Sequence, residues 1–303
     1  MKKQFKLVSI LIISSLLTGC WDYKDINKRN ITLTVGVDEV DDMKQFTCEI
    51  AKFSQGGNEK NGGSQNKNNY TVVSMGRSFE EAKKEYDFKH PLQDFSGAIR
   101  VMIFGRSYAE SGIESYINRV NHLTALRKSL PIVISREAPE ELLQRKVVND
   151  TTVGYAIEDT IRQLYKNGKS IYKTAQEIQE DIQNKEIGYV IPYIGMQDKT
   201  IDFLGLAVMS TDNKMIEVIN RDDCKGFLYL LPKKTTSTKA IYKIGKEDTI
   251  YSVRTILQKR KIKTSYIDKK INIDIDLKLR SYLQYQYYTK LLNESIVKEL
   301  EDE

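Results

Sequence analysis

The sequence has few of the residues from which most enzyme sites are built. Its 303 residues include two histidines and three cysteines. Neither His90 nor His122 has a Cys or His partner at metal-ligand spacing, and no H-E-x-x-H, C-x-x-C, G-x-S-x-G or P-loop pattern is present. We therefore predict no metal and no cofactor, and the sequence favours a protein that is not an enzyme.

Both histidines have structural interpretations. His90 directly precedes Pro91 at the end of an expected helix, where a cation stabilises the helix dipole, and His122 is expected on an exposed helix surface. Three acidic pairs are typical of first helical turns, which favour negative charge. These pairs are Glu80-Glu81, Glu140-Glu141 and Asp222-Asp223. Because sequence gives no geometry, a hydrolase that uses such a pair stays open as an alternative.

The chain also lacks strong charge of one sign. Its formal net charge is +6, and removal of residues 1–19 takes away three lysines and leaves +3. A charge this small does not indicate a nucleic-acid partner. With 40% hydrophobic residues, the chain is able to bury a substantial core.

The N-terminal apolar run is too short to cross a bilayer as a helix. It extends from Leu7 to Leu17, follows a basic cluster and ends in small residues, so residues 1–19 are predicted to be a signal peptide. Leu17, Thr18 and Gly19 directly before Cys20 match a bacterial lipobox. We predict that Cys20 carries a diacylglyceryl and an N-acyl anchor, since two signals hold a protein stably on a membrane. A plain secretory signal with an accidental cysteine is the alternative.

The remaining cysteines, Cys48 and Cys224, lie far apart in the sequence. Cys48 alternates with Phe46 and Ile50 on one face of an expected strand, which is the position of a buried small hydrophobe. Two unpaired thiols are therefore expected, and a disulfide between them stays open.

Residues 20–197 are predicted to form a mixed α/β domain. Alternating or continuous apolar runs indicate strands at 30–38, 44–53, 70–75, 99–104 and 130–134. Ser78 with Glu81, and Ser107 with Glu110, have the spacing of capping boxes, and Pro139 suits a first helical turn. Two further helices are expected between residues 152 and 185, separated by Asn167-Gly168. The polar tract 56–69 is expected to be a surface loop.

Residues 198–303 are predicted to form a second, β-rich domain, so the fold class is α+β. A hairpin around Asp212-Asn213, a short helix at 222–231 and strands at 240–244, 249–262 and 270–279 are expected. The last strand has one dry face, formed by Ile271, Ile273, Ile275, Leu277 and Leu279. We expect a C-terminal helix from Tyr282 to Leu300 to cover that face of the sheet.

Basic residues gather in the second domain. One hypothesis is that this face lies on anionic lipid, and the favoured alternative is a solvated strand face with lysines that protect a sheet edge. The residues are Lys233, Lys234, Lys239, Lys243, Lys246, Arg254, Lys259, Arg260, Lys261 and Lys263.

Several blocks of this sequence together resemble the Ger(x)C family of spore germination lipoproteins, the C subunits of nutrient germinant receptors. The first are Gly19-Cys20-Trp21-Asp22-Tyr23 and Val35-Gly36-Val37-Asp38. Gly97 to Gly105 and Ala109 to Ile113 resemble the core of the family's N-terminal domain. Gly205-Leu206-Ala207-Val208, Asp212 to Met215 and Asp222 to Leu230 resemble its C-terminal domain.

The resemblance implies a non-enzymatic subunit, held by lipidated Cys20 on the outer face of the spore inner membrane. Such a subunit works beside polytopic membrane subunits in nutrient-triggered germination. A generic envelope lipoprotein that binds a small ligand is the alternative. Asp25 stands where the family usually has Glu, and the second domain is expected to be truncated at Glu303, with an open strand edge.

Overall fold

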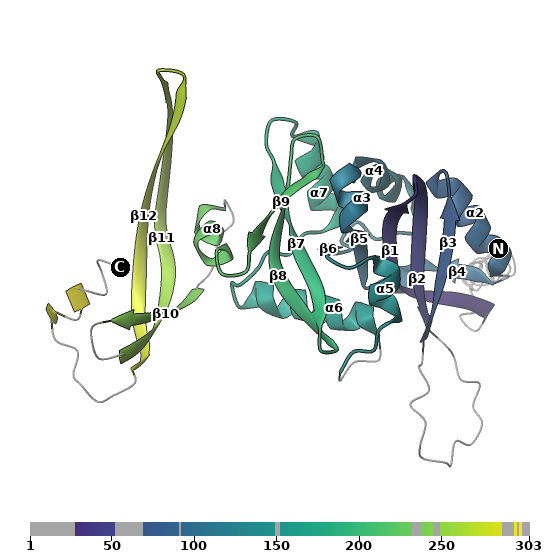
Figure 1. The fold of residues 1–303 in the computed structure, drawn as a ribbon, viewed down its shortest axis with the longest axis horizontal. Coiled ribbons are helices and arrows are strands. Elements are labelled where there is room, and N and C mark those ends of the chain that lie inside the picture. Colours follow the sequence, from purple (N-terminus) through teal and green to yellow (C-terminus); the bar gives the residue numbers. More distant parts are fainter. Residues whose placement is uncertain are drawn as a thin grey trace, which may run out of the picture.

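One mixed sheet organises most of the chain (Figure 1). The structure is a computed structural model that describes residues 28–51, 69–90, 92–148, 152–231, 238–244, 249–286, 294–295 and 297–298. Nine described strands form the large sheet in the order β3-β2-β1-β5-β6-β7-β8-β9, and β4 pairs with β1. They are β1 (Arg29–Val40), β2 (Met43–Ala51), β3 (Asn69–Gly76), β4 (Gln93–Phe95), β5 (Val101–Gly105), β6 (Ile132–Ser135), β7 (Tyr189–Gln197), β8 (Thr200–Met209) and β9 (Met215–Asn220).

The centre of this sheet is parallel and its two sides are antiparallel. Strands β1, β5, β6 and β7 run parallel to one another. The hairpins β1–β2–β3 and β7–β8–β9 continue the sheet on either side. Parallel strands are buried on both faces, which explains why β5 and β6 are continuous apolar runs rather than alternating ones.

Helices cover both faces of the sheet, and the two larger hydrophobic cores of the described residues lie between these helices and the sheet. One face packs against α2 (Phe79–Lys89), α3 (Arg106–Ser111), α4 (Glu114–His122) and α7 (Ala175–Gln183). The other packs against α5 (Pro139–Gln144), α6 (Val153–Lys166) and α8 (Cys224–Leu230). This mixture of helices with a large mixed sheet confirms the predicted α+β class.

Most predicted elements lie where the sequence placed them. Two helix N-termini differ from the capping boxes predicted for them. At α2 the Ser78 hydroxyl accepts from the Glu81 amide at 3.2 Å, but the Glu81 carboxylate accepts from Arg77 N–H rather than closing the box on Ser78. The prediction of one helix from Ser107 is wrong. Gly112, with φ 123°, separates α3 from α4, and α3 begins at Arg106 with Gly105 as its N-cap.

The large sheet continues past residue 197. Strand β7 ends at Gln197, and β8 and β9 extend the same sheet by hairpins. The division into domains 20–197 and 198–303 stays a prediction, and any boundary at Gln197 would cross a continuous hydrogen-bonded sheet. The predicted hairpin at Asp212-Asn213 is confirmed as the β8–β9 connection.

A second sheet follows α8, in the order β10-β11-β12. Its strands are β10 (Thr238–Ile244), β11 (Thr249–Ile267) and β12 (Lys270–Gln286), and β11 with β12 forms a long ribbon that stands apart from the large sheet (Figure 1). The predicted start of a helix at Tyr282 is wrong, because β12 continues to Gln286. Leu283 pairs with Val253 and Tyr285 pairs with Ser252 on β11.

The predicted dry face of β12 is present but uncovered. Ile271, Ile273 and Ile275 are 72%, 58% and 46% exposed. Helical conformation recurs in the described residues 294–295 and 297–298, which are themselves exposed. A helix that buries these isoleucines, as the sequence predicted, is therefore not observed among the described residues.

Three hairpins turn through two residues in the left-handed region. Asp41-Asp42, Asp198-Lys199 and Asp268-Lys269 have φ values from 47° to 65°. Two successive residues with positive φ give a turn whose twist matches that of the flanking strands. Asp tolerates this conformation better than most residues, but the second position is best filled by glycine.

We expect Asp42→Gly to stabilise the protein by about 1 kcal/mol, because glycine has no Cβ to oppose the left-handed conformation. Urea denaturation checks this, with Asp42→Ala as the control. Ala keeps the Cβ, so it should give no gain. Equal stability of the two variants would contradict the proposed source of strain.

Candidate functional site

The residues predicted to carry the anchor lie outside the described part of the chain. Leu17, Thr18, Gly19 and Cys20 belong to residues 1–27, and the polar tract is undescribed from residue 52 to 68. Asn69, which was predicted to close that tract, is instead the first residue of β3. Among the described residues, no helix is long and apolar enough to cross a membrane.

A buried carboxylate lies where the first parallel strand ends. Asp38 on β1 is 4% exposed, and its Oδ1 accepts from Ser107 Oγ at 2.5 Å and from Tyr108 N at 3.3 Å. Asp38 therefore caps the N-terminus of α3 from a different element. A Cβ at Gly105 would overlap the Asp38 carboxylate, which explains why glycine ends β5.

A second buried carboxylate, Glu49 on β2, joins three distant segments. Its oxygens accept from Thr34 Oγ1 at 2.7 Å, Val153 N at 3.0 Å and Gly154 N at 3.1 Å, and also from the Asn69 amide. Val153 and Gly154 are the first residues of α6, so Glu49 satisfies amides that the helix itself leaves unpaired. A Cβ at Gly154 would overlap Thr34 Oγ1.

Burial opposes the ionisation of Glu49, whereas its hydrogen bonds favour it. The side chain is fully buried, and burial raises the pKa of this carboxyl above its ordinary value of 4.5. The four hydrogen bonds act in the opposite direction and lower the pKa, but burial is the larger cause. Burial of the Glu49 carboxylate thus costs desolvation free energy, and its hydrogen bonds to three segments offset this cost.

A third polar cluster surrounds Glu158 on α6. Arg100 Nε lies 2.7 Å from Glu158 Oε2, and Arg162, one turn further along the helix, pairs with the other oxygen. The Arg100 guanidinium also lies 4.5 Å from the centre of the Tyr155 ring. Since Arg100 directly precedes β5, this cluster fixes α6 against the start of a central strand.

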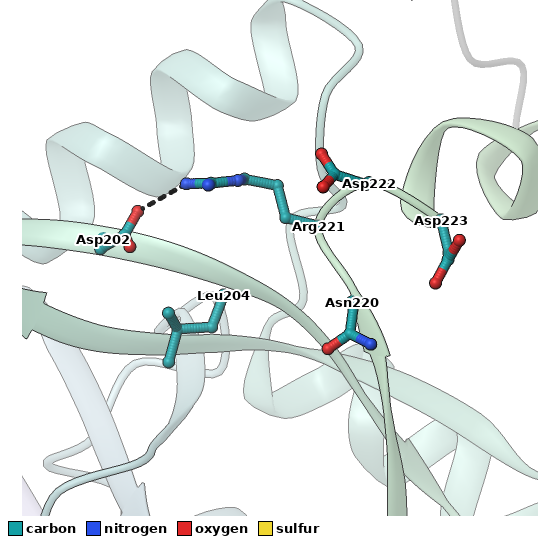
Figure 2. Close-up of a pocket in the computed structure, with 6 residues that line it drawn as sticks. All are labelled: Asp202, Leu204, Asn220, Arg221, Asp222 and Asp223. Atoms are coloured by element: carbon teal, nitrogen blue, oxygen red, sulfur yellow. Dashed lines mark hydrogen bonds and ion pairs between the residues drawn. The ribbon is translucent and has the colours of Figure 1, made fainter.

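An open cavity of about 420 Å³ lies where β9 leads into α8 (Figure 2). Arg221 Nη1 donates to Asp202 Oδ1 at 3.0 Å, and the Arg221 backbone N–H donates to the Leu204 carbonyl. Figure 2 shows Asp222 and Asp223 further along the same rim. The cavity is lined by Asp202, Leu204, Asn220, Arg221, Asp222 and Asp223. Three carboxylates and one guanidinium make this lining acidic.

The acidic pairs of the sequence lie at helix starts rather than together. Glu80 and Glu81 occupy the first turn of α2, and Glu140 and Glu141 that of α5, as predicted. Asp222 and Asp223 stand just before α8. In the described part of the chain, no three His, Cys, Asp or Glu residues are grouped so as to hold a metal ion.

The histidines and the two described cysteines occupy structural positions. His90 is the C-cap of α2, and its ring centre lies 4.8 Å from that of Tyr86 in a tilted arrangement. His122 is exposed at the end of α4. Cys48 and Cys224 are unpaired, which confirms the expectation of free thiols. Burial raises the pKa of Cys48 to about 12 and that of Cys224 to about 11, so both thiols are poorly reactive at neutral pH.

Sequence reasoning missed Asp38 and Glu49 as organising residues. Each lies in an alternating strand, where a polar residue normally indicates the solvent face. A signal was present for Asp38 alone, because it closes the block Val35-Gly36-Val37-Asp38 that carried the family resemblance. Glu49 gave none, since its partners lie 15 to 105 residues away.

Two family models match this chain in succession. The model described as the spore germination protein N-terminal domain matches residues 22–196. The model described as spore germination B3/GerAC like, C-terminal, matches residues 204–303. Together they span nearly the whole sequence.

Three curated relatives are similar to this chain. Spore germination protein A3 of Bacillus subtilis (strain 168) is 21% identical over 90% of this chain and 72% of its own length. Spore germination protein GerQC of Bacillus cereus is 20% identical over 97% and 80%. Putative spore germination protein YfkR of Bacillus subtilis (strain 168) is 28% identical over 48% and 39%.

One solved structure is also similar. The crystal structure of the GerBC protein aligns with 88% of this chain and 76% of its own chain, at 15% identity and a TM-score of 0.44.

We expect Glu49→Gln to lower the free energy of unfolding by about 1–3 kcal/mol at pH 7, because an amide NH2 group would face donors that need acceptors. The Glu49 pKa is raised by burial above its ordinary value of 4.5, so protonation stabilises the folded wild type relative to this variant as the pH falls toward 4.5. The stability difference should therefore widen on acidification.

Urea denaturation of both proteins at pH 7, 6 and 5 measures this difference. Glu81→Gln is a matched control, because Glu81 is exposed in the first turn of α2. A difference between wild type and Glu49→Gln that does not change with pH would contradict the role of burial.

Proposed function

This chain belongs to the GerAC-like family of spore germination proteins, and we propose that it is the lipid-anchored, non-enzymatic C subunit of a spore germinant receptor. In this proposal, acylated Cys20 holds the protein on the outer face of the spore inner membrane. The folded part then associates with polytopic receptor subunits, and the assembly is required for nutrient-triggered germination.

The observation that carries the proposal is the position of the family match relative to Cys20. The N-terminal family model begins at residue 22, two residues after the lipobox cysteine. A signal peptide and lipobox placed directly before the matched region would deliver the folded part to a membrane surface with a very short tether. Two acyl chains provide enough buried hydrocarbon for stable attachment.

The described polar clusters support a role as a scaffold rather than as a catalyst. Asp38, Glu49 and Glu158 each bind groups of the fold itself, and both described thiols have raised pKa values. A nucleophile needs a base within hydrogen-bond reach and a lowered pKa. The arrangement of these residues instead fixes helices to the sheet.

The alternative, an envelope lipoprotein that binds a small ligand, rests on the cavity beside α8. That cavity is open, and Arg221, the one cation among its six lining residues, already pairs with Asp202. Binding sites for small molecules are usually enclosed and mostly apolar, with a few convergent polar groups. The cavity is therefore weak support for a ligand-binding lipoprotein, and the family match is stronger support for a receptor subunit.

We expect Cys20→Ala to release the protein from membranes without unfolding it, because Cys20 lies before the first described strand. Metabolic labelling with a fatty acid should mark the wild type and not the variant. Cys224→Ala, which removes another thiol, should remain labelled and membrane-bound. Undiminished membrane association of Cys20→Ala at high salt would contradict the lipid anchor.

A germination assay separates the two functions. Spores that lack the protein, or that carry only Cys20→Ala, should lose their response to a nutrient and regain it with the wild-type chain. Normal germination of the deletion strain would contradict the receptor role and favour the ligand-binding alternative.

A further inference from the structure

The ribbon formed by β11 and β12 has an open edge. In the described residues, β12 pairs with β11 on one side and with no strand on the other. Strand β10 covers β11 only from Thr249 to Thr255. The tip of the ribbon, residues 256–280, is therefore two strands wide, and a two-stranded ribbon is marginally stable by itself.

One face of the ribbon is covered at its base and bare toward its tip. At the base, Val253 and Thr255 are buried, the Tyr229 hydroxyl of α8 donates to the Thr255 carbonyl, and Arg260 donates to the Tyr229 and Leu231 carbonyls. Beyond Arg260 the apolar face is exposed. Its exposed side chains there include Ile262, Tyr266, Ile271, Ile273 and Ile275.

The opposite face is charged, and its pairing within one chain is incomplete. Asp274 lies opposite Lys263 and Asp276 lies opposite Lys261, so both aspartates face a lysine. Lys278, in contrast, lies opposite Lys259, and like charges directly across a ribbon are destabilising. Lys278 on β12 is thus a cation whose direct cross-strand neighbour within the chain has the same charge.

We propose that the open edge of β12 binds the β12 strand of a second copy of this chain, antiparallel and centred on Leu277. In this register Asp276 lies opposite the partner copy's Lys278, and Asp274 lies opposite its Arg280. The two ribbons become one four-stranded sheet with a continuous apolar face. The proposal rests on the ribbon alone and is independent of the lipid anchor.

The charge pattern selects this register over its neighbours. Centring the pair on Asp276 would place Asp276 against itself, and centring it on Lys278 would place Lys278 against itself. A slip of one strand by a single residue against the other, for example Asp276 opposite Leu277, would set the apolar face of one copy beside the charged face of the other. Centring on Leu277 brings both Asp274 and Asp276 opposite a cation of the partner copy. It also places a carboxylate opposite Lys278, which faces Lys259 within its own chain.

The open edge also argues against insertion into lipid as the explanation of the bare face. Backbone N–H and C=O groups along an unpaired strand have no hydrogen-bond partners in a hydrocarbon layer. A partner strand satisfies these groups, and a membrane does not.

The test uses disulfide trapping in the full-length chain. Directly opposed residues in an antiparallel pair have Cα atoms about 4.5–5.5 Å apart, which a disulfide spans. Under mild oxidation, Leu277→Cys should give a covalent dimer. Ile275→Cys should not, since its two copies would lie roughly 13 Å apart along the strands. The low reactivity expected of Cys48 and Cys224 keeps the background small.

Charge variants of the trapped protein then test the register. Lys278→Asp removes the Lys259–Lys278 contact within one chain, but between chains it sets the Asp276 carboxylate against a second carboxylate. Trapping at residue 277 should slow about tenfold, as expected when two symmetric cross-strand pairs change from attraction to repulsion. The thermal midpoint should not fall. Adding Asp276→Lys to Lys278→Asp should restore the trapping rate.

Four outcomes would overturn the proposal. The first is no dimer at Leu277→Cys, and the second is equal trapping at residues 275 and 277, which would indicate unspecific aggregation. The third is a disulfide to a different protein, which would show that another chain occupies the edge. Loss of trapping in the double charge variant would reject the register.

Discussion

The hydrogen bonds of Glu49 are the constraint on which the arrangement of the larger sheet depends. This carboxylate binds β2 to Thr34 on β1, to Asn69 at the start of β3 and to the first two amides of α6. Breaking the cluster would leave a carboxylate and helix-terminal amides buried without partners, which is far more costly than the net strength of any one bond. Glu49 thus ties the start of α6 to β1–β3, and Gly154 is the point where the helix approaches Thr34 most closely.

Asp38 and Glu158 repeat this device at other junctions. Asp38 caps α3 from the end of β1, and Glu158 holds Arg100 at the start of β5. Asp38 hydrogen-bonds to polar groups of a distant element, and Glu158 forms an ion pair with one. The helices are consequently attached to the sheet by polar contacts as well as by apolar packing.

The sequence predicted the elements well where a short-range rule decides the outcome. The Ser78 cap of α2 and Pro139 at the start of α5 both act within one helical turn. Prediction failed where a distant contact competes with the local pattern. Ser107 has the spacing of a capping residue, but its hydroxyl donates to Asp38, 69 residues away, and Gly112 ends the helix. Glu49 looked like an ordinary solvent-facing residue of a strand for the same reason.

The segment after Leu279 shows how a tertiary partner decides between two periodicities. Tyr285 and Tyr288 fit a helical spacing with Leu291 and Leu292, whereas Leu283 to Gln286 also alternates as a strand does. Strand β11 extends back to Thr249, so it offers ladder partners as far as Gln286, and the strand conformation prevails there. Local preference is weak where two periods coexist, and the available hydrogen-bond partner then determines the structure. Because β12 is long, it extends beyond the strands that could cover it, and its outer edge and isoleucine face have no neighbour among the described residues. The free backbone groups of that edge can form a further ladder only with another strand.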